Sequence, residues 1–120
     1  MLLSFRSLDS FDNEISYKAE YQKNDNTYVF DDLSAENTKT FLTIDGDVVR
    51  IKRTGDTESE FTFSENLKLP GYYKNNLGVN AELSIFTKKI NIKSDKIYLE
   101  YDLILDDDVI SSHKIWILFH

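Results

Sequence analysis

The chain has 120 residues, enough for one domain of ordinary size, and we treat residues 1–120 as a single domain. Its composition is 41% hydrophobic and 29% charged with only four glycines and one proline, which excludes collagen-like, low-complexity and disordered chains. The formal net charge of −7 argues against nucleic acid and anionic membranes as partners, unless the few cations gather on one face.

The first residues do not have the pattern of a secretory signal. Charges at Arg6 and Asp9 interrupt the apolar run of about 7 to 15 residues that a signal peptide needs. No other stretch approaches the roughly 18 apolar residues of a membrane-spanning helix. We therefore expect a cytoplasmic protein with no membrane partner.

The residue types favour strands over helices. Ile, Val, Thr and the aromatic residues make up a third of the chain, whereas there are only three alanines. Apolar residues recur at every second position from Ile97 to Leu105, and similar alternation covers Val48–Arg53, Val79–Thr87 and His113–Phe119. The alternation predicts ten strands, near residues 2–8, 15–23, 27–31, 38–44, 47–54, 58–63, 67–74, 78–92, 96–105 and 108–119.

Turns and irregularities can be placed along the same chain. The strongest hairpin signal is Ile44–Val48, where Asp45 and Gly46 suit the two central positions of a type I′ turn. Residues 33–36 are the only segment suited to a helical turn. The alternation changes phase before Ile90, which predicts a β-bulge near Lys88 and Lys89.

Strands joined by such short links must pair antiparallel with their neighbours. A meander of nine or ten strands is too wide to stay open without curling, because its free edges would promote aggregation. We therefore predict an all-β fold in which a single antiparallel meander closes into a barrel of about 8 to 10 strands. A sandwich of two sheets is the alternative.

From Val48 onward the chain resembles a known family. The residues that carry the resemblance are Arg53–Asp56 ahead of Phe61–Phe63, Tyr73 followed by Gly78, Leu83–Ile90 and Ile97–Leu103. They are similar to the YwiB-like proteins (DUF1934), a bacterial family of unknown function with a calycin-like, that is lipocalin-like, β-barrel. The resemblance implies the barrel fold and supplies no reaction.

Arg53 is the first candidate functional residue. It shares a strand face with Val49 and Ile51, so its guanidinium is expected to point to the barrel interior or its mouth. A buried guanidinium needs a negative partner. That partner is either an anionic ligand or an acidic side chain of the protein, and a third alternative is an arginine that extends to water at the strand end.

Aromatic residues supply the other candidates. Tyr73, Tyr101, Phe63 and Trp116 are expected to line a ligand cavity, because barrels of this size either fill their interior or enclose one small molecule. Plain packing of the same side chains in the core is the alternative reading.

The sequence offers few residues for catalysis. Without cysteine there are no disulfides, thiolate metal sites or cysteine nucleophiles, and we expect no catalytic residue, metal or cofactor. Asp106–Asp108 fits a solvated hairpin tip better than a calcium loop. Glu58 and Glu60 share a strand face, as an acid–base pair would, and Ser111 lies on the same face as His113.

Three functional hypotheses follow. The first is a non-catalytic protein that binds a small anionic or apolar ligand inside the barrel or at its mouth. The second is a protein-interaction module that uses a sheet edge or the acidic first half, including Asp31, Asp32 and Glu36. The third is an enzyme that uses Arg53 with a nearby carboxylate or tyrosine. We expect no nucleic-acid partner, and the sequence leaves the oligomeric state open.

Overall fold

A computed structural model describes residues 1–120, and its elements are all strands. They are β1 (Leu2–Asp9), β2 (Glu14–Asn24), β3 (Thr27–Asp31), β4 (Thr38–Asp45), β5 (Val48–Gly55), β6 (Thr57–Phe63), β7 (Lys68–Asn75), β8 (Asn80–Ile92), β9 (Lys96–Leu105) and β10 (Asp108–Phe119). The predicted strands are confirmed to within two residues at each end. No helix of the chain is long and apolar enough to cross a membrane.

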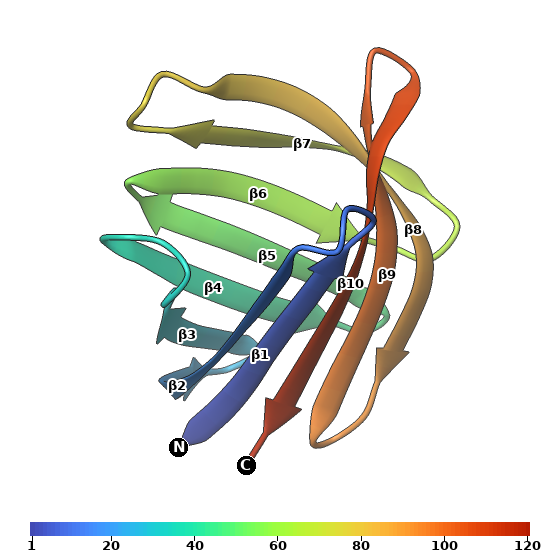
Figure 1. Cartoon of the computed structure of the whole chain (residues 1–120). Coiled ribbons are helices and arrows are strands. Elements are labelled where there is room, and N and C mark those ends of the chain that lie inside the picture. Colours follow the sequence, from blue (N-terminus) through green and yellow to red (C-terminus); the bar gives the residue numbers. More distant parts are fainter.

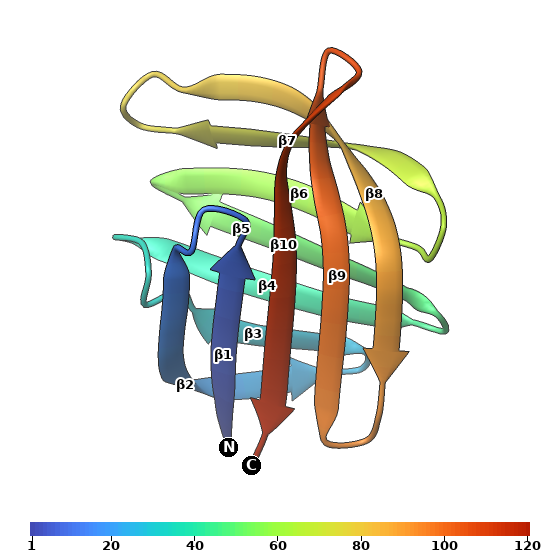
Figure 2. The same ribbon diagram turned by 45° about the vertical axis from the view of Figure 1, so that its right-hand side comes forward.

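The ten strands form one closed antiparallel barrel. Each strand pairs with its neighbours in the sequence, and β1 pairs with β10 from Leu3 opposite Phe119 to Asp9 opposite His113. The predicted all-β antiparallel meander closed into a barrel is therefore confirmed, and the sandwich alternative is wrong. Figure 2 shows β3 to β7 running across the view, while β1, β9 and β10 run nearly upright, and Figure 1 shows the same two directions from another side.

Two long strands connect these directions. Strand β2 pairs with β1 along Glu14–Glu20 and with β3 along Tyr21–Asn24. Strand β8 pairs with β7 in its first half and with β9 in its second, and its register against β9 shifts between Thr87 and Lys89. The bulge predicted near Lys88 and Lys89 is thus confirmed, at the place where β8 passes from one set of strands to the other.

Alternation decides which side chains fill the barrel. Inward positions such as Leu3, Phe5, Ile115 and Ile117 are buried, while their strand neighbours face out. The buried cluster is largest at the end where β1 begins and β10 ends. Its members are Leu3, Phe5, Ala19, Phe30, Leu42, Val49, Ile51, Phe63, Ile85, Ile97, Leu99, Tyr101, Ile115 and Ile117.

The hairpin between β4 and β5 differs from its predicted form by one residue. Asp45 pairs with Val48, so the central positions are Gly46 and Asp47, and only Gly46 has a positive φ, of 60°. This pattern belongs to a type II′ turn. The type I′ pattern occurs at the β9–β10 tip instead, where Asp106 and Asp107 both have positive φ.

The ladder between β6 and β7 is short. It contains only four pairs, from Thr57 opposite Asn75 to Glu60 opposite Tyr72, whereas β7 and β8 share seven. Beyond Glu60 the strand β6 continues without pairing to β7. Pro70, which has no N–H to donate, lies in the facing part of β7.

Gly55 ends β5 in a conformation that a larger residue cannot adopt. Its φ is 126°, and a Cβ atom would lie 1.9 Å from the carbonyl oxygen of Asn37. Gly46 also has positive φ, but a Cβ there would meet nothing within 4 Å. The two glycines therefore separate the cost of backbone strain from the cost of a clash.

We expect Gly55→Ala to lower the free energy of unfolding by about 3 kcal/mol or more, because strain and clash add. Gly46→Ala should cost only about 1 kcal/mol, since it introduces strain alone. Urea unfolding of both variants measures the difference. Equal losses in the two variants would show that the close approach of Asn37 to Gly55 is wrong.

Candidate functional site at the barrel mouth

Polar side chains gather on the inner face at the end of the barrel opposite to the buried cluster. Thr40, Arg53, Ser59 and Tyr73 lie directly opposite one another on β4, β5, β6 and β7 and form one inward-facing row. Thr40 and Ser59 are almost fully buried, whereas Arg53 and Tyr73 are partly exposed. Gly55, the last inward position of β5, has no side chain, so Arg53 supplies the last inward side chain of this strand, and a quarter of it is exposed.

Arg53 forms an ion pair with Asp32, which lies in the β3–β4 loop. Arg53 Nε is 3.1 Å from Asp32 Oδ2, and the exposed fractions of the two side chains are 25% and 0%. Asp32 Oδ1 accepts hydrogen bonds from the backbone N–H and the hydroxyl of Ser34. Of the alternatives that the sequence left open for Arg53, the structure contains the internal ion pair.

The backbone and the carboxylate of Asp32 both form hydrogen bonds within the β3–β4 loop. Asp32 N–H donates to the carbonyl of Thr38, and Ala35 N–H donates to the carbonyl of Asp32. The second bond closes a reverse turn, and residues 33–36, which were suited to a helical turn, contain turns and a bend instead. A carboxylate that binds the N–H two residues ahead is a common way to close such turns.

Two tyrosines border the ion pair. Tyr17 projects inward from β2, and burial, followed by the negative charge of Asp32, raises its pKa. Tyr101 projects inward from β9, and burial raises its pKa, while the positive charge of Arg53 acts in the opposite direction. Both phenols therefore stay protonated near neutral pH, and a hydrogen bond from the Tyr17 hydroxyl to Asp32 contributes to the raised pKa of Tyr17.

Three buried oxygen atoms at the inner face accept or donate no hydrogen bond. They are Asp32 Oδ2, Thr40 Oγ1 and Thr87 Oγ1. Asp32 Oδ2 still has the charge of Arg53 beside it, although the pair is not aligned as a hydrogen bond. Thr40 stands opposite Arg53 on the neighbouring strand, so an unpartnered hydroxyl and a partly exposed guanidinium share the same row.

A second polar group lies across the mouth on β10. His113 stacks on Tyr101 with ring centroids 5.0 Å apart, and Ser111 Oγ lies 2.7 Å from His113 Nε2. The side of the strand shared by Ser111 and His113 is thus confirmed. Burial lowers the pKa of His113, against the raising effect of the carboxylates of Asp9 and Asp102, so the imidazole is neutral near pH 7.

Four of the residues expected to bind a ligand point into the barrel, but they do not lie together. Arg53 and Tyr73 belong to the inward-facing row near the mouth, whereas Tyr101 is buried in the core cluster, close enough to Arg53 for its charge to act on the Tyr101 phenol. Phe63 is fully buried and packs on Tyr101 at 4.8 Å, so it belongs to the core. Whether these residues bind a ligand stays a prediction.

Trp116 was expected to line the interior, and this is wrong. It alternates with the buried Ile115 and Ile117 on β10 and therefore faces out, where Arg6 lies 4.7 Å from its ring. The same alternation was already visible in the sequence.

Sequence reasoning missed Tyr17, Thr40, Ser59 and the role of Asp32. The first three follow from alternation, because they share strand faces with Ala19, Leu42 and Phe61 respectively. Asp32 was treated as part of an acidic exterior, yet it is buried inside the barrel rim. No local signal marks it, because its partner is on another strand.

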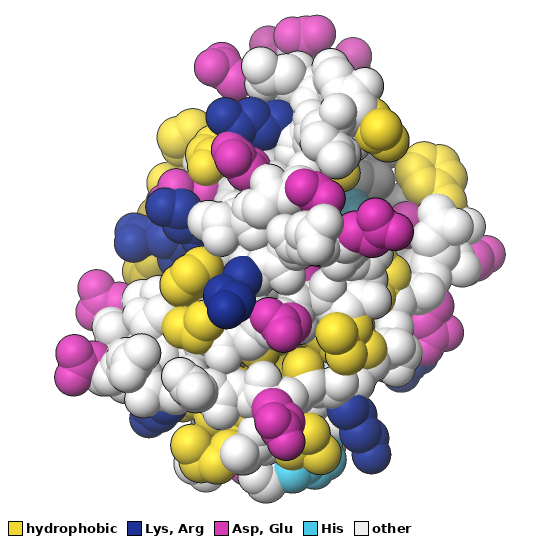
Figure 3. All heavy atoms as spheres, turned by 90° about the vertical axis from the view of Figure 1, so that its left-hand side faces the viewer, with side chains coloured by type: hydrophobic (Ala, Val, Ile, Leu, Met, Phe, Trp, Pro, Cys, Tyr) yellow, Lys and Arg dark blue, Asp and Glu magenta, His cyan; other side chains and the backbone are white.

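Of the two interaction surfaces that the sequence suggested, the structure tests only the sheet edge, and a protein partner at the acidic first half stays a prediction. A closed barrel has no free sheet edge, so docking through an edge is wrong. Figure 3 shows acidic side chains scattered among basic and apolar ones on one face, without a continuous acidic patch. Glu58 and Glu60 do not form an acid–base pair, because they bind Lys74 at 3.0 Å and Arg50 at 3.7 Å.

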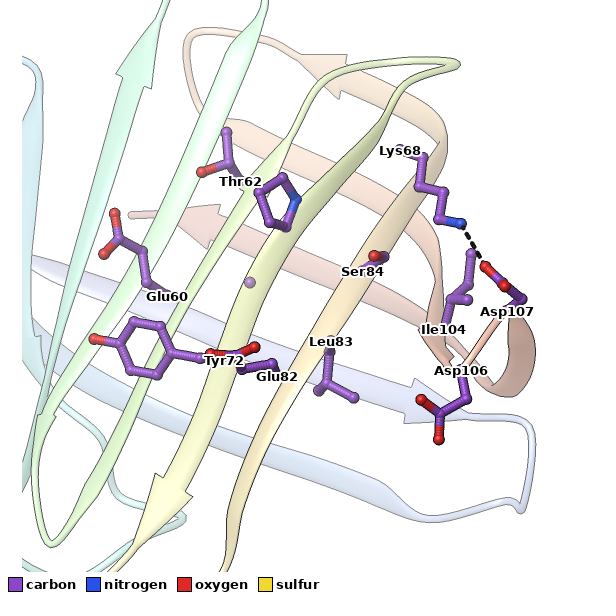
Figure 4. A pocket seen from close by; sticks show the side chains of 12 residues that line it. Glu60, Thr62, Lys68, Tyr72, Glu82, Leu83, Ser84, Ile104, Asp106 and Asp107 are labelled. Carbon is purple, nitrogen blue, oxygen red and sulfur yellow. Dashed lines mark ion pairs between the residues drawn. The ribbon is translucent and has the colours of Figure 1, made fainter.

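The largest groove lies outside the barrel, over β6 to β8 and the β9–β10 tip. It has a volume of about 720 Å³ and is drawn in Figure 4, with the ion pair of Lys68 and Asp107 at one end. Its walls include Glu60, Tyr72 and Glu82. It is wide open to solvent and contains none of the unpartnered buried oxygens, so the mouth remains the better candidate site.

Removing the charge of Asp32 tests the ion pair. We expect Asp32→Asn to lower the free energy of unfolding by about 2 to 3 kcal/mol, because it leaves the guanidinium of Arg53 without its counter-charge. Asp31→Asn, at an exposed carboxylate next to it, should cost less than about 0.5 kcal/mol. Chemical denaturation measures both, and similar losses would contradict the buried pair.

The lowered pKa of His113 predicts a pH dependence of stability. The unfolded chain, with a histidine pKa near 6.5, takes up the proton before the folded chain does. The contribution of neutral His113 is therefore complete above about pH 6.5 and is lost as the pH falls through its lower folded pKa. Urea unfolding at pH 7 and at pH 5 should show that His113→Asn loses less stability over this range than the wild type does, and an equal loss in both would contradict the lowered pKa of His113.

Comparison with known proteins agrees with the barrel. A family model described as "Domain of unknown function (DUF1934)" matches residues 9–117. The crystal structure of the ywiB protein from Bacillus subtilis matches with a TM-score of 0.67 and 17% identity, covering 99% of this chain and 90% of that one. No curated protein matches significantly. The chain therefore belongs to the DUF1934 family of unknown function and has the fold of its YwiB-like members.

Proposed function

We propose that the protein is a non-catalytic binding protein that holds a small carboxylate-bearing ligand at the mouth of the barrel, against Arg53. The observation that carries the proposal is the way Arg53 is held. Asp32 approaches the guanidinium at Nε, while a quarter of the side chain is exposed at the mouth. The two Nη atoms carry the other four N–H donors, and two of these, one on each Nη, point the same way and can bind a carboxylate with two hydrogen bonds.

The surroundings of Arg53 support a polar ligand of limited size. Thr40 supplies a buried hydroxyl without a partner, and the protonated phenols of Tyr17 and Tyr101 lie near the same charge. Below this row, the barrel is filled by the buried cluster that includes Phe63 and Leu99. A ligand would therefore enter the mouth with its carboxylate first and leave its apolar part near Tyr73 at the mouth.

Asp32 has a specific part in this proposal. Its negative charge fixes the guanidinium and keeps the site neutral overall when no ligand is bound. A ligand carboxylate would then bind the far edge of a guanidinium that is already oriented, which lowers the entropy cost of binding. As part of the same proposal we place the protein in the cytoplasm, where a fold that contains no disulfide is compatible with reducing conditions.

A ligand screen tests the proposal with benzoate, hexanoate and inorganic phosphate as probes. At 100 times its dissociation constant, a bound probe should add about 2.7 kcal/mol to the free energy of unfolding. We expect a carboxylate to raise the melting temperature of the wild type and to lose this effect in Arg53→Gln. The amide and guanidinium NMR signals of Arg53 should shift with the same probe.

Arg50→Gln is the matched control, because it removes a charge from the outer face of the same strand. Neutral hexanamide controls for the apolar part of the probe. The proposal fails if no carboxylate shifts the Arg53 signals, or if Arg50→Gln weakens binding as much as Arg53→Gln does. Phosphate binding without carboxylate binding would reject the ligand class.

A further inference from the structure

The outer wall formed by β8, β9 and β10 has an aromatic pair at its centre. Trp116 on β10 and Tyr98 on β9 are direct neighbours, with ring centroids 5.5 Å apart. The Arg6 guanidinium lies over the Trp116 ring, and the Tyr98 hydroxyl donates to Glu100. These contacts hold both rings in fixed positions on the exterior, and the mouth does not use them.

A groove of about 400 Å³ runs beside this pair. Its walls are Trp116, Tyr98 and the 40% exposed Leu118, and its polar end is formed by Asn91, Lys93 and Lys96. The groove is therefore mostly apolar, with two ammonium groups and one amide at one end. This is the usual composition of a small-molecule site, in which a few polar groups fix the orientation of an apolar ligand.

The two lysines of the groove have no carboxylate partner. Neither Lys93 nor Lys96 forms an ion pair, although Asp95 lies between them in the same hairpin. Seven of the 14 Lys and Arg side chains form no ion pair. Five of these seven lie on the outer surface of the neighbouring strands β2, β1, β10, β9 and β8 or in the β8–β9 hairpin. These five are Lys18, Lys89, Lys93, Lys96 and Lys114.

The unpaired cations thus gather on one wall of a protein whose net charge is −7. They do not form a continuous track, because Glu20, Glu100 and Asp102 lie among them. A nucleic-acid backbone needs such a track. A single anionic group that binds beside Lys93 and Lys96 does not need a continuous track of cations.

We propose that this groove is a second binding site, for a free small molecule that combines an apolar ring or chain with one carboxylate or sulfonate. The apolar part lies against Trp116, Tyr98 and Leu118. The anion lies between the ammonium groups of Lys93 and Lys96, with the Asn91 amide as a further donor. The site is independent of Arg53, which is on the inner face of the opposite part of the barrel.

The experiment uses two probes that differ in one group. 8-Anilinonaphthalene-1-sulfonate carries an anion, and N-phenyl-1-naphthylamine is the matching neutral compound. Trp116 is the only tryptophan, so all tryptophan emission reports on this groove. We expect the sulfonate to quench Trp116 emission by energy transfer, with an affinity at least about tenfold higher than that of the neutral probe.

Charge reversal locates the anion. The double variant Lys93→Glu/Lys96→Glu should weaken sulfonate binding by at least about tenfold and leave the neutral probe unchanged. Lys52→Glu and Lys114→Glu are the matched controls, since both remove an unpaired exposed lysine outside the groove. Arg53→Gln should leave sulfonate binding intact, so failure at the mouth and failure at this groove give different results.

Each opposite outcome overturns the proposal. Bound sulfonate without quenching of Trp116 would place the probe elsewhere. Equal losses in the groove variant and in the lysine controls would show attraction by overall charge alone. Chemical shifts of the Asn91, Lys96 and Leu118 amides give a second readout, and their absence during titration would reject the site even where fluorescence changes.

Discussion

The structure depends on the pairing of β1 with β10, because this seam turns a meander into a closed barrel. Closure satisfies the backbone groups that an open sheet would leave at two edges, and it creates a single interior. Every strand then has one side committed to that interior and one side committed to the exterior. The position of a residue along its strand decides which chemistry it can take part in.

Closure also separates the interior into two unlike halves. Near the start of β1 the inward positions are apolar and form the buried cluster. Towards the mouth the same alternation places Thr40, Ser59 and Arg53 inside. A charge at that depth is tolerated because Asp32 reaches it from the β3–β4 loop, with its own carboxylate fixed by Ser34. The polar half of the interior therefore depends on the Arg53–Asp32 ion pair as well as on closure of the barrel.

Most of the fold follows from local patterns, whereas the site follows from them only in part. Alternation located all ten strands and the bulge at Thr87–Lys89, because both are properties of neighbouring residues. The inward direction of Arg53 came from the same rule. The partner of Arg53 did not, since Asp32 is 21 positions away in a loop, and only closure of the fold brings the two together.

The errors have physical causes as well. The β4–β5 turn moved by one residue because Gly46 accepts a positive φ at either central position, so the local sequence does not fix the register. An interior position was predicted for Trp116 because a large aromatic side chain is usually buried. Here it lies outside, where Arg6 covers one face of the ring.

The short ladder between β6 and β7 gives the barrel a weak line. Only four pairs join these strands, and Pro70 donates nothing to the neighbouring strand. Local opening of a protein is favoured where backbone bonds are few, so we expect the wall to open between Phe61 and Leu69 more readily than between β9 and β10, which share ten pairs. Solvent and small solutes would then reach the interior from the side as well as through the mouth.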